Sequence, residues 1–311
     1  MRLIFLPFLL VVGFAAQGAE RDYQVVQGAG GVPLNVVTVG ERTKPAIVFV
    51  HGIGQSHLSF EEQLDSKLAE QFYLIAFDLR GHGNSGKPWA PEAYTESRTW
   101  ADDLQHVIQA TGASRPVLVG WSYGTLVVVD YVRHYGTDGL AGIVLTGAYG
   151  GLTPPPPAPE PQLAAAFQRN RERQLSADLT ENIAAARFTA KLLTARQMPE
   201  AWYERATVIA LMLPPYARRS MFARPLDNVG VIPDIRVPLL LLVGGKDPSA
   251  PDGLGRELVA QLSNARRVVF ADSGHSPFLE EPARFNDQLS TFVLSCRPQP
   301  VITRQRSVLL Q

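Results

Sequence analysis

Cysteine is almost absent from this chain of 311 residues. Cys296 is the only one, so no intramolecular disulfide can form in any compartment. An excess of one charge is also absent, because 29 Lys and Arg residues balance 29 Asp and Glu residues and no basic run stands out. Nucleic acid and anionic membrane surfaces are therefore not expected as partners. Neither clustered His, Cys and Glu at ligand spacing nor a P-loop is found, so we expect no metal and no cofactor.

The N-terminal sequence MRLIFLPFLLVVGFAAQGAE has an apolar run only from Leu3 to Ala16. A run this short is typical of a secretory signal peptide rather than of a membrane-spanning helix. Small residues before Ala19 predict a signal peptide over residues 1–18, cleaved after Gly18, with cleavage after Ala19 as the alternative. We therefore expect an exported protein, periplasmic or secreted, whose mature chain has no membrane span. An uncleaved membrane anchor is the competing interpretation.

Beyond residue 18, apolar strand-like runs alternate with amphipathic helix-like segments. Continuous runs such as AIVFV and PLLLLVGG are typical of strands covered on both faces, as in a parallel sheet. The alternation predicts an α/β doubly wound fold with a mostly parallel, eight-stranded sheet flanked by helices. The expected strands are Tyr23–Gln27, Leu34–Val39, Ala46–Val50, Tyr73–Asp78, Pro116–Trp121, Leu140–Thr146, Val237–Val243 and Arg267–Ala271. The expected helices are Leu58–Gln71, Thr99–Thr111, Tyr123–Tyr135, Gly253–Ser263 and Pro277–Ser295.

The alternation is interrupted over residues 152–228. The segment opens with TPPPPAPEP, which runs extended because proline fixes φ and has no N–H, and continues as helix-like sequence without strands. We predict a helical cap over residues 152–228, inserted into a core of residues 19–151 and 229–297. Residues 298–311 are expected to form a loosely ordered tail.

Ser122 lies between two glycines, at the point where a strand-like run becomes helix-like (VLVGWSYGTLVVVDYV). In a G-x-S-x-G motif the glycines allow a sharp strand-to-helix turn that presents the serine in a strained, exposed position. A hydroxyl is a poor nucleophile near neutral pH, so it also needs a base and donors for the negative charge that develops. Ser122 is the predicted nucleophile.

The loop HGIGQS follows the strand AIVFV and offers the N–H of Ile53, while the turn offers the N–H of Tyr123. These two backbone groups are the expected oxyanion donors. His51 opens the loop and is expected to shape it, with its ring turned inward, rather than to act as the base.

Two further loops supply the expected partners of the serine. Asp247 follows the strand LLLLVGG, at the sheet edge where open α/β proteins place their sites, and is preferred over Asp252, which is expected to open the next helix. His275 follows the last expected strand, and histidine both accepts and returns a proton near pH 7. The other histidines lie on helix-like patterns or in loops without this context.

The motifs HGIGQS, DLRGHGNSGKP, GWSYG, GGKDPSAP and DSGHSPFLEEP resemble those of the α/β-hydrolase superfamily, and most closely its cofactor-free haloperoxidase/aryl esterase group. The resemblance implies an α/β-hydrolase fold and the chain order Ser122, Asp247, His275 for the catalytic triad. It also implies a structural role for His82. Serine at the elbow argues against the related epoxide hydrolases and haloalkane dehalogenases, which carry aspartate there. Gly54 stands where many relatives have proline.

The sequence therefore predicts a serine hydrolase that cleaves small carboxylic esters or lactones through an acyl-serine intermediate. The same triad would serve a perhydrolase or cofactor-free haloperoxidase, an acyltransferase or a carbon–carbon bond hydrolase. A non-enzymatic ligand-binding relative is the alternative from another class. The physiological substrate, the shape of the cap pocket and the oligomeric state stay open.

Overall fold

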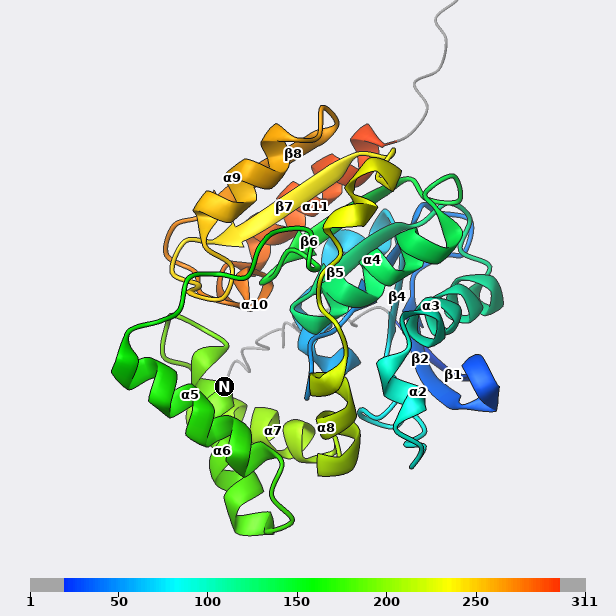
Figure 1. The fold of residues 1–311 in the computed structure, drawn as a ribbon. Helices are drawn as coiled ribbons and strands as arrows, with labels where there is room; N and C mark the ends of the chain where they lie inside the picture. Colours follow the sequence, from blue (N-terminus) through cyan, green and yellow to red (C-terminus); the bar gives the residue numbers. More distant parts are fainter. Residues whose placement is uncertain (1–19, 297–311) are drawn as a thin grey trace, which may run out of the picture.

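The computed structural model describes residues 20–296, which fold around one eight-stranded sheet (Figure 1). The strand order is β1-β2-β4-β3-β5-β6-β7-β8, in which β2 runs antiparallel to its neighbours and the other pairs are parallel. The strands are β1 (Arg21–Gln27), β2 (Pro33–Val39), β3 (Ala46–Val50), β4 (Tyr73–Phe77), β5 (Val117–Trp121), β6 (Gly142–Thr146), β7 (Leu239–Gly244) and β8 (Ala265–Phe270). The predicted fold class is confirmed.

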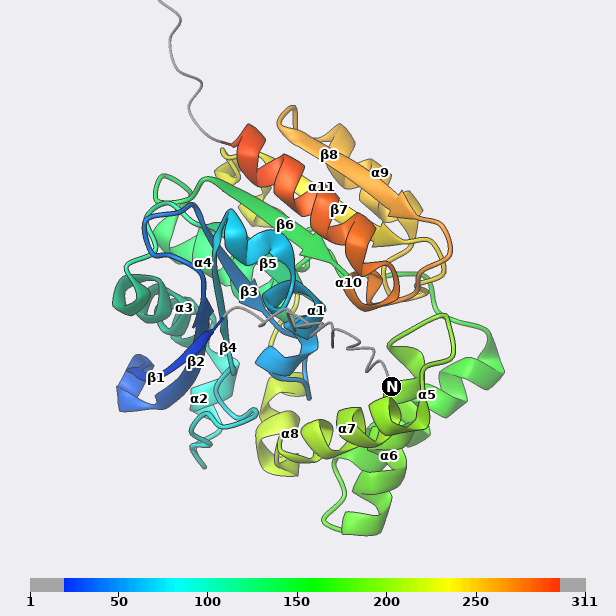
Figure 2. The same cartoon turned by 180° about the vertical axis from the view of Figure 1, so that it is seen from behind.

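Helices cover both faces of the sheet, which is why the central strands are continuous apolar runs with every residue buried. The helices α3, α4 and α9 pack on one face (Figure 1), and α1 and α11 pack on the other (Figure 2). The α-helices are α1 (Glu61–Leu64), α2 (Glu92–Thr95), α3 (Ser97–Thr111), α4 (Tyr123–Tyr135), α5 (Pro161–Gln174), α6 (Leu179–Leu192), α7 (Glu200–Leu211), α8 (Pro215–Ala223), α9 (Asp252–Ala260), α10 (Pro277–Glu280) and α11 (Pro282–Ser295). The 3-10 helices are η1 (Ala29–Gly31), η2 (His57–Phe60), η3 (Lys67–Glu70) and η4 (Val229–Asp234).

Two of the expected helices were wrong as continuous elements. The segment Leu58–Gln71 is divided into η2, α1 and η3. The break between α1 and η3 occurs because Ser66 has an extended backbone and its hydroxyl caps the N–H of Leu68. The segment Pro277–Ser295 is divided into α10 and α11 at Glu281, whose backbone leaves the helical region because Pro282 follows it.

The helices α5–α8 form the insertion between β6 and β7 and lie beyond one end of the sheet (Figures 1 and 2). The predicted helical insertion is therefore present, while its limits at residues 152 and 228 stay a prediction. The predicted signal peptide and tail fall outside the described residues. No helix within residues 20–296 has the length and apolar character that crossing a membrane requires.

A buried ion pair joins the insertion to the core. Arg224, directly after α8, donates from Nη2 to both carboxylate oxygens of Asp130 in α4, at 2.7 and 2.8 Å. Its Nη1 donates to the hydroxyl of Tyr123 at 3.2 Å, and the guanidinium lies over the rings of Tyr123 and Trp100. The insertion is thus attached to the helix that begins at the Gly-x-Ser-x-Gly turn.

Candidate active site

Ser122 occupies a sharp turn between β5 and α4, with φ 53° and ψ −119°. Such values are sterically costly for a residue with a Cβ. A Cβ on Gly120 would lie 2.8 Å from Cα of Thr125, and a Cβ on Gly124 would overlap with the carbonyl of Val50. The two glycines are therefore required by close backbone contact, and they allow β5 to turn directly into the helix.

His275 lies in the loop between β8 and α10, and Asp247 follows β7. Nδ1 of His275 is 2.8 Å from Oδ2 of Asp247. A neutral imidazole that donates from Nδ1 to a carboxylate has Nε2 free to accept a proton. The main chain of the histidine is fixed as well, since its carbonyl accepts a 2.9 Å hydrogen bond from the indole N–H of Trp121 beside Ser122.

The competing carboxylate lies elsewhere. Asp252 is in the first turn of α9 and accepts a hydrogen bond from Arg267 at 2.5 Å, so its charge is already paired. Sequence reasoning missed Ser249, whose hydroxyl donates to Oδ1 of Asp247 at 2.6 Å and lies 3.0 Å from Nδ1 of His275. No local pattern distinguishes Ser249 from an ordinary loop serine.

Asp247 is held as a carboxylate by these contacts. Burial alone would raise its pKa, but the charge and hydrogen bond of His275, together with the two bonds from Ser249, outweigh burial and lower the pKa below its ordinary value. An ionised Asp247 can stabilise the imidazolium that forms when His275 accepts a proton.

Four of the five predicted site residues line one cavity, and Asp247 lies outside its wall. The side chain of Asp247 is behind His275, while Ser122, His275, Ile53 and Tyr123 all contribute to the wall of one cavity. Within residues 20–296, neither the N–H of Ile53 nor that of Tyr123 donates to a protein acceptor. An oxyanion site requires backbone donors that have no acceptor within the protein.

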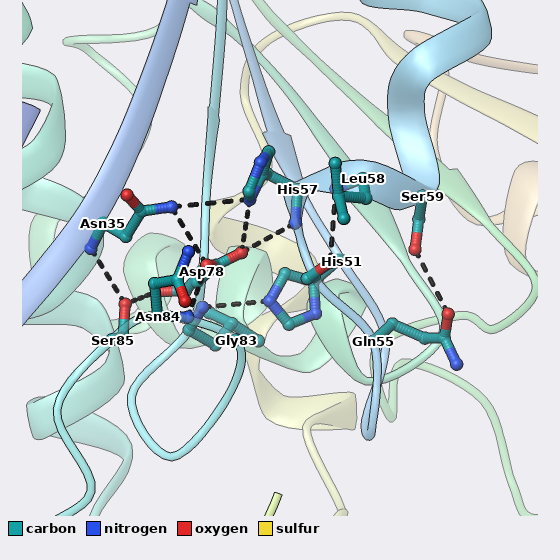
Figure 3. A network of polar contacts seen from close by, with 12 residues as sticks. Asn35, His51, Gln55, His57, Leu58, Ser59, Asp78, Gly83, Asn84 and Ser85 are labelled. Atoms are coloured by element: carbon teal, nitrogen blue, oxygen red, sulfur yellow. Dashed lines mark hydrogen bonds and ion pairs between the residues drawn. The ribbon is translucent and has the colours of Figure 1, made fainter. Parts of the chain in front are cut away.

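A polar network around Asp78 holds the loop that carries Ile53 (Figure 3). The carboxylate of Asp78 accepts hydrogen bonds from the backbone N–H and Nδ1 of His57, both at 2.8 Å, and from the Asn35 side chain and the Asn84 N–H. Burial raises the pKa of Asp78, but the bonds and charge of His57 lower it well below its ordinary value. The network therefore holds the C-terminal end of the loop, at His57, through one buried carboxylate.

His51 has the structural position that the sequence indicated. It is fully buried, its Nδ1 is 2.8 Å from the carbonyl of Gly52, and its Nε2 accepts the N–H of Leu79 at 2.9 Å. Burial lowers its pKa to about 4, so the ring is neutral near pH 7. Gly54 has φ +68°, a value that proline cannot adopt, so the loop differs here from one with proline at this position.

The shared cavity has a volume of about 800 Å³ and lies between the Ser122 turn and the insertion. Its wall is mostly apolar and includes Leu126, Met221, Phe222 and a run of prolines from Pro154 to Pro156. A cavity of this size and character suits a small organic molecule rather than a polymer segment bound through charges.

Comparisons with known proteins agree with this fold. The sequence profile described as "alpha/beta hydrolase fold" matches residues 45–282. A Burkholderia cenocepacia protein assigned as an aryl esterase is 33% identical with a TM-score of 0.81, covering 88% of this chain and 99% of its own. The esterase RhEst1 from Rhodococcus sp. ECU1013 is 28% identical with a TM-score of 0.77, covering 88% and 99%. A bromoperoxidase from Bacillus anthracis shares the fold, at 20% identity and a TM-score of 0.75, covering 88% and 100%.

Proposed function

Because this chain belongs to the α/β-hydrolase family, we propose that it is a serine esterase in which Ser122, His275 and Asp247 hydrolyse small carboxylic esters or lactones. The observation that carries the proposal is the 2.8 Å contact between His275 and Asp247 at the wall of the cavity that Ser122 also lines. A carboxylate, a base and a strained serine so placed are the parts that acyl transfer needs.

In the proposed reaction, the Ser122 hydroxyl gives its proton to Nε2 of His275 as Oγ bonds to the carbonyl carbon of the ester. The carbonyl oxygen becomes an oxyanion held by the N–H groups of Ile53 and Tyr123. The C–O bond to the leaving alcohol then breaks, and His275 returns its proton to that oxygen. Water repeats the sequence on the acyl-serine, releases the acid and restores the hydroxyl.

The cavity wall supports the proposed substrate class. Apolar side chains surround Ser122, and the nearby insertion limits the space to about 800 Å³, so uncharged esters with short acyl or aryl groups suit it best. The similarity to an esterase at 28% identity and to a protein assigned as an aryl esterase at 33% identity supports this class.

A panel of p-nitrophenyl esters from acetate to laurate tests the proposal. We expect turnover that is highest for short or medium acyl groups and falls by about 10⁴-fold or more in Ser122→Ala. Unchanged turnover in Ser122→Ala would place the nucleophile elsewhere, and no turnover of any ester by the wild type would favour a ligand-binding protein.

The same assay with hydrogen peroxide or a second alcohol separates hydrolysis from acyl transfer. Comparable release of p-nitrophenol with and without peroxide, and free acid as the main product, would support plain hydrolysis over perhydrolysis, acyltransfer or carbon–carbon cleavage. We also propose export to the periplasm or the medium, which N-terminal sequencing of the mature protein tests. A chain that starts at Met1 would contradict it.

A further inference from the structure

Arg218 in α8 is a buried cation without a carboxylate partner in the part of the chain that the structure describes. It is 7% exposed, and its Nη2 donates to the carbonyl of Ala210 at 2.9 Å. Within residues 20–296, the other two buried arginines each have an acid: Arg80 pairs with Asp103 at 2.6 Å and Arg224 pairs with Asp130 at 2.7 Å. Arg218 is therefore the exception among the three.

A charge buried in this way is unfavourable unless something compensates it. Burial lowers the pKa of Arg218 to about 10, so the guanidinium still carries its charge near pH 7. The carbonyl of Ala210 belongs to the last turn of α7, and a helix C-terminus offers roughly half a negative charge. Part of the positive charge is left without compensation.

The neighbouring titratable groups do not supply the negative charge that would compensate Arg218. His82 is fully buried, its pKa is lowered well below the ordinary value by burial, and the charge of Arg218 lowers it further. It is therefore neutral. Asp78, the carboxylate that acts on His82, already accepts hydrogen bonds from His57, Asn35 and Asn84.

Arg218 faces a separate small cavity of about 20 Å³ between the insertion and the loop that carries Ile53. Both terminal nitrogens would lie 3.5 Å from a Cβ on Gly54, so the guanidinium packs directly against that loop. Gln55 also lines the cavity, its Oε1 accepts from Ser59 at 3.3 Å, and its amide NH₂ has no acceptor among residues 20–296. The remaining polar wall comes from Gln174, Asn182 and Thr189 of α5 and α6.

We propose that this cavity binds one halide-sized monovalent anion, which pairs with Arg218 and accepts a hydrogen bond from Gln55. A volume of about 20 Å³ exceeds the roughly 10–15 Å³ that one water molecule needs, so the cavity has room for a halide-sized ion. The bound anion would join the insertion helices α5, α6 and α8 to the loop that carries Ile53. The site is distinct from the large cavity, although Ile53 contributes to both walls.

Thermal unfolding in sodium chloride against sodium gluconate at equal ionic strength tests the site. Mass action predicts that Tm rises with chloride by about 2–4 °C per tenfold increase above the dissociation constant. Arg218→Gln should abolish the chloride-specific rise. Arg219→Gln, which changes the exposed arginine next to it in α8, should retain it. A rise of equal size in all three proteins, or no rise in the wild type, would overturn the proposal.

Crystals of the wild-type protein soaked in sodium bromide provide a second test that does not depend on a variant that folds. The expected result is an anomalous bromide peak inside the small cavity, within about 3.5 Å of the Arg218 guanidinium. The absence of a peak there at molar bromide, with bromide bound only at exposed sites, would overturn the proposal.

Discussion

The backbone at Ser122 should store strain that a glycine removes. At φ 53° and ψ −119°, the Cβ of any L-residue is crowded, whereas glycine enters this region at little steric cost. We therefore compare Ser122→Gly with Ser122→Ala. Both variants lack the hydroxyl and should lack esterase activity, but only the glycine variant also loses the Cβ.

The size of the effect follows from two opposing contributions. A residue in such a region costs about 1–3 kcal/mol, which glycine recovers. Glycine also gives the unfolded chain more freedom, which costs about 0.5–1 kcal/mol relative to alanine. The difference predicts that Ser122→Gly is more stable than Ser122→Ala by about 1 kcal/mol, or by about 2–4 °C in Tm.

Urea denaturation at 25 °C and differential scanning calorimetry measure this difference on the two purified variants. The same slope against urea in both would show that the unfolded state is comparable. If Ser122→Gly were instead the less stable variant by about 0.5–1 kcal/mol, the entropic cost of glycine would act alone. The turn would then hold no strain, and the argument for a strained nucleophile would fail.

Three further predictions concern charged groups. Asp247→Asn should lower kcat by about 10³–10⁴-fold, whereas Asp252→Asn should leave kcat nearly unchanged in the same ester assay. Equal losses of kcat in the two variants would refute the assignment of Asp247 as the carboxylate that acts on His275. The lowered pKa of Asp247 means that its contribution to stability is present above its ordinary pKa of 3.8 and is lost as the pH falls through the folded value. The difference in unfolding free energy between wild type and Asp247→Asn should therefore shrink below about pH 4 in urea titrations, and a constant difference would contradict this sign. Arg224→Met leaves the buried carboxylate of Asp130 unpaired and should lower the unfolding free energy by about 3–5 kcal/mol. The control Arg219→Met changes an exposed arginine and should lower it by about 0.5 kcal/mol or less. Similar losses in the two variants would show that the buried ion pair does not stabilise the fold more than an exposed arginine does.

The sequence predicted the elements whose local pattern and tertiary environment agree. The apolar run Val117–Trp121 and the helix Tyr123–Tyr135 were placed almost residue by residue, because both are buried and glycines mark the turn between them. The prediction of one helix over Leu58–Gln71 was wrong because the apolar spacing carries no information on the competing hydrogen bonds that Ser66 makes with the backbone.

The contacts that tie distant segments together could not be predicted in the same way. Asp78 with His57, and Arg224 with Asp130, join residues that are 21 and 94 positions apart, and neither member of these pairs has a distinguishing local pattern. The pairing of Asp247 with His275 was anticipated because each follows an expected strand, and because the resemblance to the α/β-hydrolase superfamily implies their order in the chain. The shape of the large cavity depends on the packing of α5–α8, which periodicity does not determine.

The most direct test is to identify the residue that becomes covalently modified when the protein meets a reagent that phosphonylates nucleophilic serines. Wild-type protein and His275→Ala would be treated with a fluorophosphonate, digested and mapped by mass spectrometry. We expect a single adduct on Ser122 that forms rapidly in the wild type and far more slowly in His275→Ala. An adduct on another residue, or modification of Ser122 at the same rate without the imidazole, would contradict it.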